Sequence, residues 1–169
     1  IHSAGATKAG AFVEMPDEAW RDGFDLKFFP AVRLTRLFWP MLRDAKGHVV
    51  NIIGGAARTP DPQFLIGGSV NAAMSNFSKG LSQLGKREGV NVNVIHPGMT
   101  ETDRVTQLFA QRAAASGKAP EELRAQALKD GMGQPDDIAA LAVFLCGAQA
   151  RHIQGTATAV DGGATPGFY

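Results

Sequence analysis

Four side chains near one glycine-rich stretch could take part in proton transfer: Ser69, Ser75, Thr100 and His96. An ordinary serine or threonine hydroxyl is a poor general acid near neutral pH and needs a partner group. His96 stands at the end of a predicted strand, directly before Pro97, and an imidazole titrates near neutral pH. Two interpretations of His96 stay open: a proton donor, or a packed and hydrogen-bonded strand residue.

The glycine-rich stretch is residues 51–71, NIIGGAARTPDPQFLIGGSVN. It has the pattern of a strand end, a tight turn, a loop and the beginning of a helix. In a parallel α/β sheet, ligands bind and reactions occur at the carboxyl ends of the strands. The stretch is therefore the expected centre of the site, although glycines stand at its strand end, where polar side chains would be expected.

Composition narrows the possible functions. The net charge of +1 does not favour binding to nucleic acid or to an anionic membrane surface, and the apolar runs are too short to span a bilayer. The four histidines share no ligand spacing with one another or with Cys146, so no metal site is expected. A single cysteine allows no disulfide within the chain, and we expect a cytoplasmic protein.

The elements that must position these residues alternate along the chain. Strands are predicted at residue 1 and at residues 48–53, 90–96 and 156–160. Helical patterns begin at Pro16 and Ser69, with a kink at Pro30, and a further helix opens at Pro135. Cys146 lies beside the apolar stripe of that last helix and is expected in the core.

This alternation predicts the α/β fold class, with a Rossmann-type parallel sheet that has helices on both faces. The 169 residues are enough for a single domain with a sizeable core. Residues 103–131 form a pair of predicted helices between two strands, and we expect them to act as a lid over a substrate.

Five segments resemble motifs of the short-chain dehydrogenase/reductase family, in the family's order and spacing. They are IHSAG, WRDGFDLK, HVVNIIGG, VNVNVIHPGMTET and GQPDDIAALAVFLCGAQARHIQGTATAVDGG. The resemblance covers essentially all 169 residues and corresponds to the carboxyl-terminal two-thirds of the family's fold. The first strands of that fold and its Gly-rich phosphate loop have no counterpart in this sequence. They are expected to precede residue 1 in a longer molecule, and the alternative is a truncated protein.

The family's catalytic serine, tyrosine, lysine and asparagine are replaced here. The resemblance places Gly54 at the serine, Gly67 at the tyrosine, Asn71 at the lysine and Lys27 at the asparagine. The only tyrosine is Tyr169, whose tail could reach a neighbouring subunit's site. Phe64 lies in the loop past which a substrate would move, and we interpret its ring as part of the packed wall of the site.

Lys27 and Asn71 suggest an exchanged pair, because the family has asparagine first and lysine second, close together. In this hypothesis Lys27 supplies the cation and Asn71 a ribose or water contact, and both are the candidate catalytic residues. The alternative is that Lys27 points to solvent and Asn71 caps the amino terminus of a helix.

The resemblance also implies the cofactor, NAD or NADP. Ala4 and Gly5 correspond to the backbone beside the adenosine ribose, while Pro97, Gly98 and Thr102 correspond to the turn beneath the nicotinamide. The expected function is an NAD(P)-dependent oxidoreductase that acts on a small carbonyl or alcohol substrate. The alternatives are a dinucleotide-binding or regulatory protein without turnover, and a structural subunit. Relatives commonly assemble, so a homodimer or homotetramer is expected.

Overall fold

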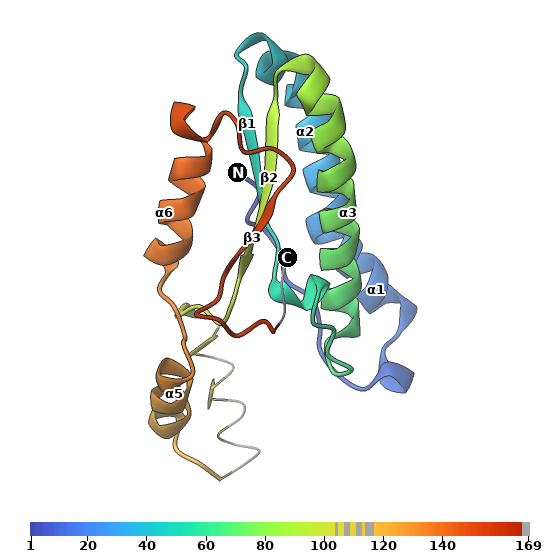
Figure 1. The fold of residues 1–169 in the computed structure, drawn as a ribbon. Coiled ribbons are helices and arrows are strands. Elements are labelled where there is room, and N and C mark those ends of the chain that lie inside the picture. The colour runs from blue at the N-terminus through green and yellow to red at the C-terminus, as the bar shows by residue number, and fades with distance from the viewer. Residues whose placement is uncertain (104, 107–108, 111–112, 114–116, 167–169) are drawn as a thin grey trace.

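The computed structural model describes residues 1–103, 105–106, 109–110, 113 and 117–166. Its centre is a parallel sheet of three strands in the order β1-β2-β3 (Figure 1). These strands are β1 (His48–Ile52), β2 (Asn91–Pro97) and β3 (Ala157–Val160). The register pairs Val50 with Asn93 and Ile95 with Thr158. The prediction of a parallel sheet is confirmed.

The segment at the amino terminus continues the sheet beyond β1. His2 forms a parallel bridge with Asn51, and its backbone exchanges hydrogen bonds of 2.9 and 2.8 Å with Val50 and Ile52. The strand predicted at residue 1 is thus present as a single bridge. Its position places residues 1–3 beside the carboxyl half of β1.

Helices cover both faces of the sheet, as predicted (Figure 1). One face carries α1 (Asp17–Gly23), the π-helical turn η2 (Phe24–Phe28), α2 (Phe29–Asp44) and α3 (Leu65–Glu88). The other face carries α6 (Pro135–Leu145), and α5 (Pro120–Lys129) lies beyond the end of the sheet. The described residues also form three short turns of 3-10 helix: η1 (Phe12–Glu14), η3 (Gly55–Ala57) and η4 (Ala148–Ala150).

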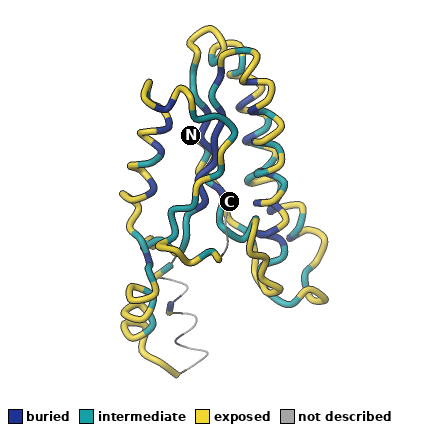
Figure 2. The backbone as a smooth tube through the Cα atoms, in the orientation of Figure 1, coloured by how far each residue is buried: buried dark blue, intermediate teal, exposed yellow. Residues whose placement is uncertain are grey.

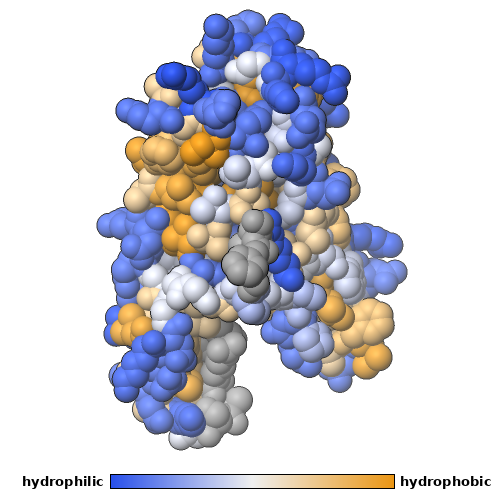
Figure 3. Space-filling model, in the orientation of Figure 1, coloured by the Kyte–Doolittle hydropathy of each residue, from blue (hydrophilic) through white to orange (hydrophobic). Residues whose placement is uncertain are grey.

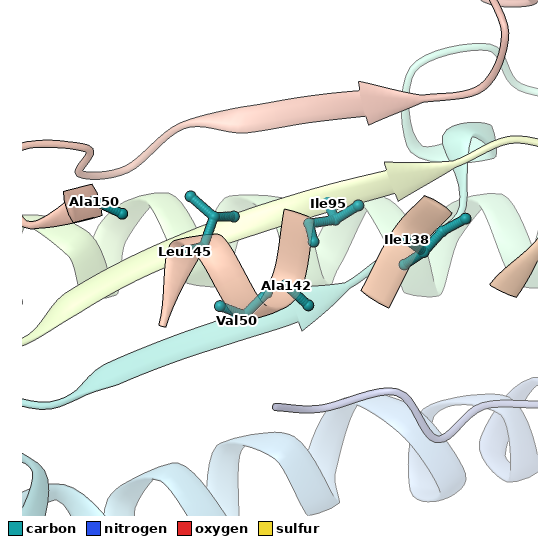
Figure 4. Close-up of a cluster of buried hydrophobic side chains, with 6 residues drawn as sticks. All are labelled: Val50, Ile95, Ile138, Ala142, Leu145 and Ala150. Atoms are coloured by element: carbon teal, nitrogen blue, oxygen red, sulfur yellow. The ribbon is translucent and has the colours of Figure 1, made fainter. Parts of the chain in front are cut away.

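Each face has its own apolar core, because strand side chains alternate between the two sides of the sheet. Ile95 of β2 points towards α6 and packs in the cluster drawn in Figure 4. Its neighbour Val94 points the other way and packs with Met74 of α3 and Ala31 of α2. Between these two layers, β1 and β2 are buried along most of their length, whereas the edge strand β3 is more exposed (Figure 2).

Several helix limits follow from local chemistry. Gly89 ends α3 in the left-handed conformation, with φ of 80°, as expected of a glycine cap. Gln134 and Asp137 form a reciprocal capping box at the start of α6, with Pro135 in its first turn. A kink was predicted at Pro30, and the helix is irregular just before it: the π-helical turn η2 ends at Phe28, and Pro30 lies in the first turn of α2.

The structure differs from the predicted elements at the start of α3 and at the end of α6. α3 begins at Leu65, four residues before the predicted start, so Gly67 and Gly68 are already helical. Cys146 is exposed and is not a core residue, because it lies after Leu145, where α6 has ended. The helix predicted from Asp103 lies partly outside the described residues.

Candidate functional site

A cavity of about 910 Å³ opens at the carboxyl ends of β1 and β2. Its floor is the backbone of Gly54, Gly55, Pro97 and Gly98, and α6 forms one wall. Most of its lining is apolar, and apolar side chains also gather at the surface over α6 (Figure 3). The cavity therefore lies where ligands bind in parallel α/β sheets.

Lys27 and Asn71 meet at the edge of this cavity. The Lys27 ammonium donates a hydrogen bond of 2.7 Å to Asn71 Oδ1, although the residues are 44 positions apart. Lys27 lies in the π-helical turn η2, a type of helix irregularity that is frequent at functional sites. The expectation that the exchanged pair is close together is confirmed. Their catalytic role stays a prediction.

The alternative, in which Lys27 points to solvent and Asn71 caps the amino terminus of a helix, is wrong. Phe64 is the residue that precedes α3, whereas Asn71 lies in the second turn of the helix and is buried. Lys27 is half-buried, and its side chain crosses Gly5 on its way to Asn71. A β-carbon on Gly5 would lie 2.8 Å from Lys27 Cδ, so the missing side chain at residue 5 makes room for the lysine.

The two glycines at the family's serine and tyrosine positions differ in their surroundings. A β-carbon on Gly54 would lie 3.0 Å from Asn71 Nδ2. A β-carbon on Gly67 would lie 2.1 Å from two carbons of the Phe64 ring. The amide of Asn71 and the ring of Phe64 thus lie where side chains at these two positions would begin. Both Phe64 and Asn71 line the cavity.

His96 is buried on the α3 side of the sheet. Its Nδ1 donates to the carbonyl oxygen of Ile53 at 2.6 Å, because a carbonyl can only accept. Its Nε2 is buried and has no hydrogen-bond partner among the described residues. Burial lowers the pKa of His96, and the charges of Arg58 and Lys27 add to this effect. Of the two interpretations, the geometry favours a packed and hydrogen-bonded strand residue.

The other proton-transfer candidates have local roles or none. Ser75 donates to the carbonyl oxygen of Asn71 at 3.0 Å, and Thr100 donates to that of Gly98 at 3.1 Å. Ser69 is exposed on α3 and does not line the cavity, whereas Thr100 does. Tyr169 lies outside the described residues.

The predicted cofactor contacts divide into two groups. Pro97, Gly98 and Thr102 line the cavity, but Ala4 and Gly5 are exposed and are not among the lining residues. Ile1 and Ser3 line it instead, because alternate residues of an extended segment face the same side. Ile138 and Val143 of α6 also line the cavity and were not predicted as site residues. The apolar periodicity of α6 had indicated only that this helix packs on the sheet.

The segment that leads into the predicted lid is anchored to the start of α6. The backbone of Gly133 exchanges hydrogen bonds of 2.9 Å with Met99 and Glu101. The Glu101 carboxylate accepts hydrogen bonds from Gln134 and Arg124, which hold its pKa below the ordinary value. Residues 103–131 lie partly outside the described residues, and their role as a lid stays a prediction.

Two kinds of feature are absent from the described residues. Within this part of the chain, no group of three or more His, Cys, Asp or Glu side chains could hold a metal ion. No helix in the described ranges is both long and apolar enough to cross a membrane.

Known proteins resemble this chain over nearly its full length. Residues 1–165 match the family model described as "Enoyl-(Acyl carrier protein) reductase". The chain is 29% identical to nodulation protein G of Rhizobium sp. (strain N33), covering 96% of this chain and 64% of that protein. It is 26% identical to the 3-oxoacyl-[acyl-carrier-protein] reductase FabG of Vibrio harveyi, covering 96% of this chain and 64% of that protein.

Among solved structures, the L-sorbose reductase of Gluconobacter frateurii, complexed with NADPH and L-sorbose, superposes with a TM-score of 0.92. The identity is 25%, and the match covers 99% of this chain and 66% of that one. The chain thus spans just under two thirds of the length of the relatives it matches.

Proposed function

Because the chain belongs to the short-chain dehydrogenase/reductase family, we propose that it acts as an NAD(P)-dependent oxidoreductase on a small carbonyl or alcohol substrate. The observation that carries the proposal is the apolar cavity at the ends of β1 and β2, with the Lys27–Asn71 pair at its edge. An apolar cavity with a few polar groups is typical of small-molecule sites.

The residues of the cavity fit the nicotinamide half of such a cofactor. Gly54, Gly55 and Gly98 present backbone without side chains to the cavity, so a flat ring can approach closely. Ser3 and Thr102 supply hydroxyls at the rim. A bound nicotinamide supplies or accepts a hydride. The chain's part is to hold the ring on this floor, to exclude water with α6 and Phe64, and to orient the substrate's oxygen.

The test is binding and turnover with the purified full-length protein. We expect NADH or NADPH to quench the fluorescence of Trp20 and Trp39, and the absorbance at the nicotinamide band to fall with at least one ketone or aldehyde of a panel. Absence of binding and of turnover contradicts the proposal.

A second candidate function has an observation in its favour. Gly54 and Gly67 have no side chains with which to perform the family's usual proton transfer. A protein of this kind could bind the dinucleotide and serve as a regulatory or structural subunit. Binding without turnover of any substrate in the panel supports this candidate over the first.

We also infer that the protein forms a homodimer or homotetramer. Four apolar side chains of α2 are exposed along one side of the helix: Leu34, Leu37, Phe38 and Met41. Burial of such a stripe against a second copy stabilises association. The single cysteine supports a cytoplasmic setting.

A further inference from the structure

The side-chain amide of Asn71 has a defined orientation. A lysine ammonium can only donate, so the atom that faces Lys27 at 2.7 Å is the carbonyl oxygen Oδ1. The amino group Nδ2 must then point away from Lys27. It faces Gly54, 3.0 Å from the point where a side chain on residue 54 would begin.

The Nδ2 group is available to a ligand. Asn71 lines the cavity, and no hydrogen bond to another described residue engages its Nδ2. The other polar side chains that line the described part of the cavity are hydroxyls: Ser3, Thr100 and Thr102. The amide of Asn71 is therefore the side-chain N–H donor that the described residues present to the cavity.

We propose that Asn71 Nδ2 donates a hydrogen bond to the carbonyl oxygen of the substrate, at the place that a side chain on residue 54 would otherwise occupy. Lys27 is the positioning residue, which holds the amide with its N–H groups towards the cavity. The proposal rests on the proposed function. It gives Asn71 a contact with the substrate, in place of the ribose or water contact expected from the sequence.

The N–H group of Asn71 would stabilise the negative charge that develops on the substrate's oxygen during carbonyl reduction. The carbonyl oxygen gains negative charge as hydride adds to the carbon, and a fixed N–H donor stabilises that charge. The hydrogen bond from Lys27 to Oδ1 is charge-assisted and polarises the amide, which makes its N–H groups stronger donors. Gly54 is necessary to this geometry because a side chain there would crowd Nδ2.

The first test replaces the donor. Asn71→Leu keeps the branched shape and removes the N–H, and we expect kcat for an accepted ketone to fall by about 100-fold, the usual loss of one such donor. The dissociation constant for NADPH should stay within about twofold, because the amide contacts substrate and not cofactor. Asn71→Asp, which can pair with Lys27 but cannot donate, should lose as much. Ser69→Ala, exposed on the same helix, is the control and should behave like the parent.

A second pair of variants separates this role from a structural one. Asn71→Ala removes the amide and leaves space next to residue 54. Adding Gly54→Ser in that background introduces a hydroxyl donor at the same place. We expect Gly54→Ser/Asn71→Ala to be about tenfold more active than Asn71→Ala. A double variant that is no better than the single one contradicts the proposal.

A readout without turnover distinguishes failure of this inference from failure of the proposed function. The Asn71 side-chain amide gives a pair of ¹H–¹⁵N signals, identified by their absence from the Asn71→Leu spectrum. Titration with cyclohexanone should shift this pair downfield in the unmodified chain and less so in Lys27→Met. If no ketone is reduced but the shift occurs, the oxidoreductase function falls and the donor site stands. If ketones are reduced, but the Asn71 signals do not shift with cyclohexanone and kcat is unchanged in Asn71→Leu, the donor assignment falls.

Discussion

The ring of Phe64 occupies the space that a side chain on residue 67 would need, with ring carbons 2.1 Å from the position of its β-carbon. Phe64 directly precedes α3, and Gly67 lies in the first turn of that helix, three residues later. A tyrosine at residue 67 is therefore excluded by two residues: Gly67 has no side chain, and the Phe64 ring fills the space that one would need. Restoring one side chain requires the other to move.

A thermodynamic cycle measures this steric coupling. Gly67→Ala should lower the free energy of unfolding by about 1–2 kcal/mol, because the Phe64 ring is forced to move. In a Phe64→Ala background the same change should be neutral or stabilising, since alanine favours a helix over glycine. Urea denaturation of the parent, the two single variants and the double variant gives the coupling free energy between residues 64 and 67.

The matched control is Gly80→Ala in the middle of the same helix. A β-carbon there has no atom within 4 Å, so the change should stabilise the protein by about 0.5–1 kcal/mol. If Gly67→Ala stabilises the protein as much as Gly80→Ala does, the ring does not oppose a side chain at residue 67.

Replacement of Lys27 tests the partner of Asn71 in the exchanged pair. Lys27→Met removes the ammonium that holds the amide of Asn71, and we expect kcat to fall by about tenfold, a smaller loss than removal of a donor itself. Steady-state kinetics with an accepted ketone provide the measurement. Lys86→Met, at the exposed end of α3, is the control. Unchanged turnover and cofactor affinity in Lys27→Met would rule out the exchanged-pair hypothesis, in which Lys27 supplies the cation.

Burial of His96 makes stability depend on pH. Its pKa in the folded chain is below the ordinary value of about 6.5, mainly because burial disfavours the charged ring. As the pH falls below about 6.5, the unfolded chain therefore binds more protons than the folded chain does. The free energy of unfolding then decreases as the pH falls further. His2, whose pKa is also lowered by burial, contributes with the same sign.

We expect the free energy of unfolding to be lower at pH 5 than at pH 7.5 in the parent. In His96→Asn the difference between the two pH values should be smaller, because one of the two histidine contributions is gone. Urea denaturation at both pH values measures it. An equal pH dependence in parent and variant would mean that His96 titrates normally in the folded chain.

Charges on α2 should weaken self-association. Leu37 and Met41 are exposed by 70% and 65% and lie four residues apart, on one side of the helix. Leu37→Glu/Met41→Glu should shift the sedimentation of the protein to the monomer, because two buried charges would repel their copies across a symmetric interface. Arg36→Glu, exposed on the same helix, is the comparison. A parent that sediments as a monomer at high concentration contradicts the inferred assembly.

Local patterns of the sequence were sufficient for the fold. The alternation around Val94 and Ile95 indicates a strand, and it reflects the two cores that these residues join in the structure. Gly89 marks the end of α3 because only glycine readily adopts the left-handed conformation there. Such signals can be read from sequence because they depend on neighbours along the chain. The closeness of Lys27 and Asn71 also followed from the sequence, but only through the family's motifs.

The details of the site depend on residues that are distant in sequence. The direction of the Asn71 amide is set by Lys27, 44 residues away, and the role of Gly54 depends on where that amide points. Cys146 was expected in the core, but the end of α6 leaves it exposed. A residue's type and spacing thus determined the strands, helices and location of the site. Only the packing of η2 against α3 decided which atoms face the cavity, because donor directions depend on three-dimensional contacts that no local pattern records.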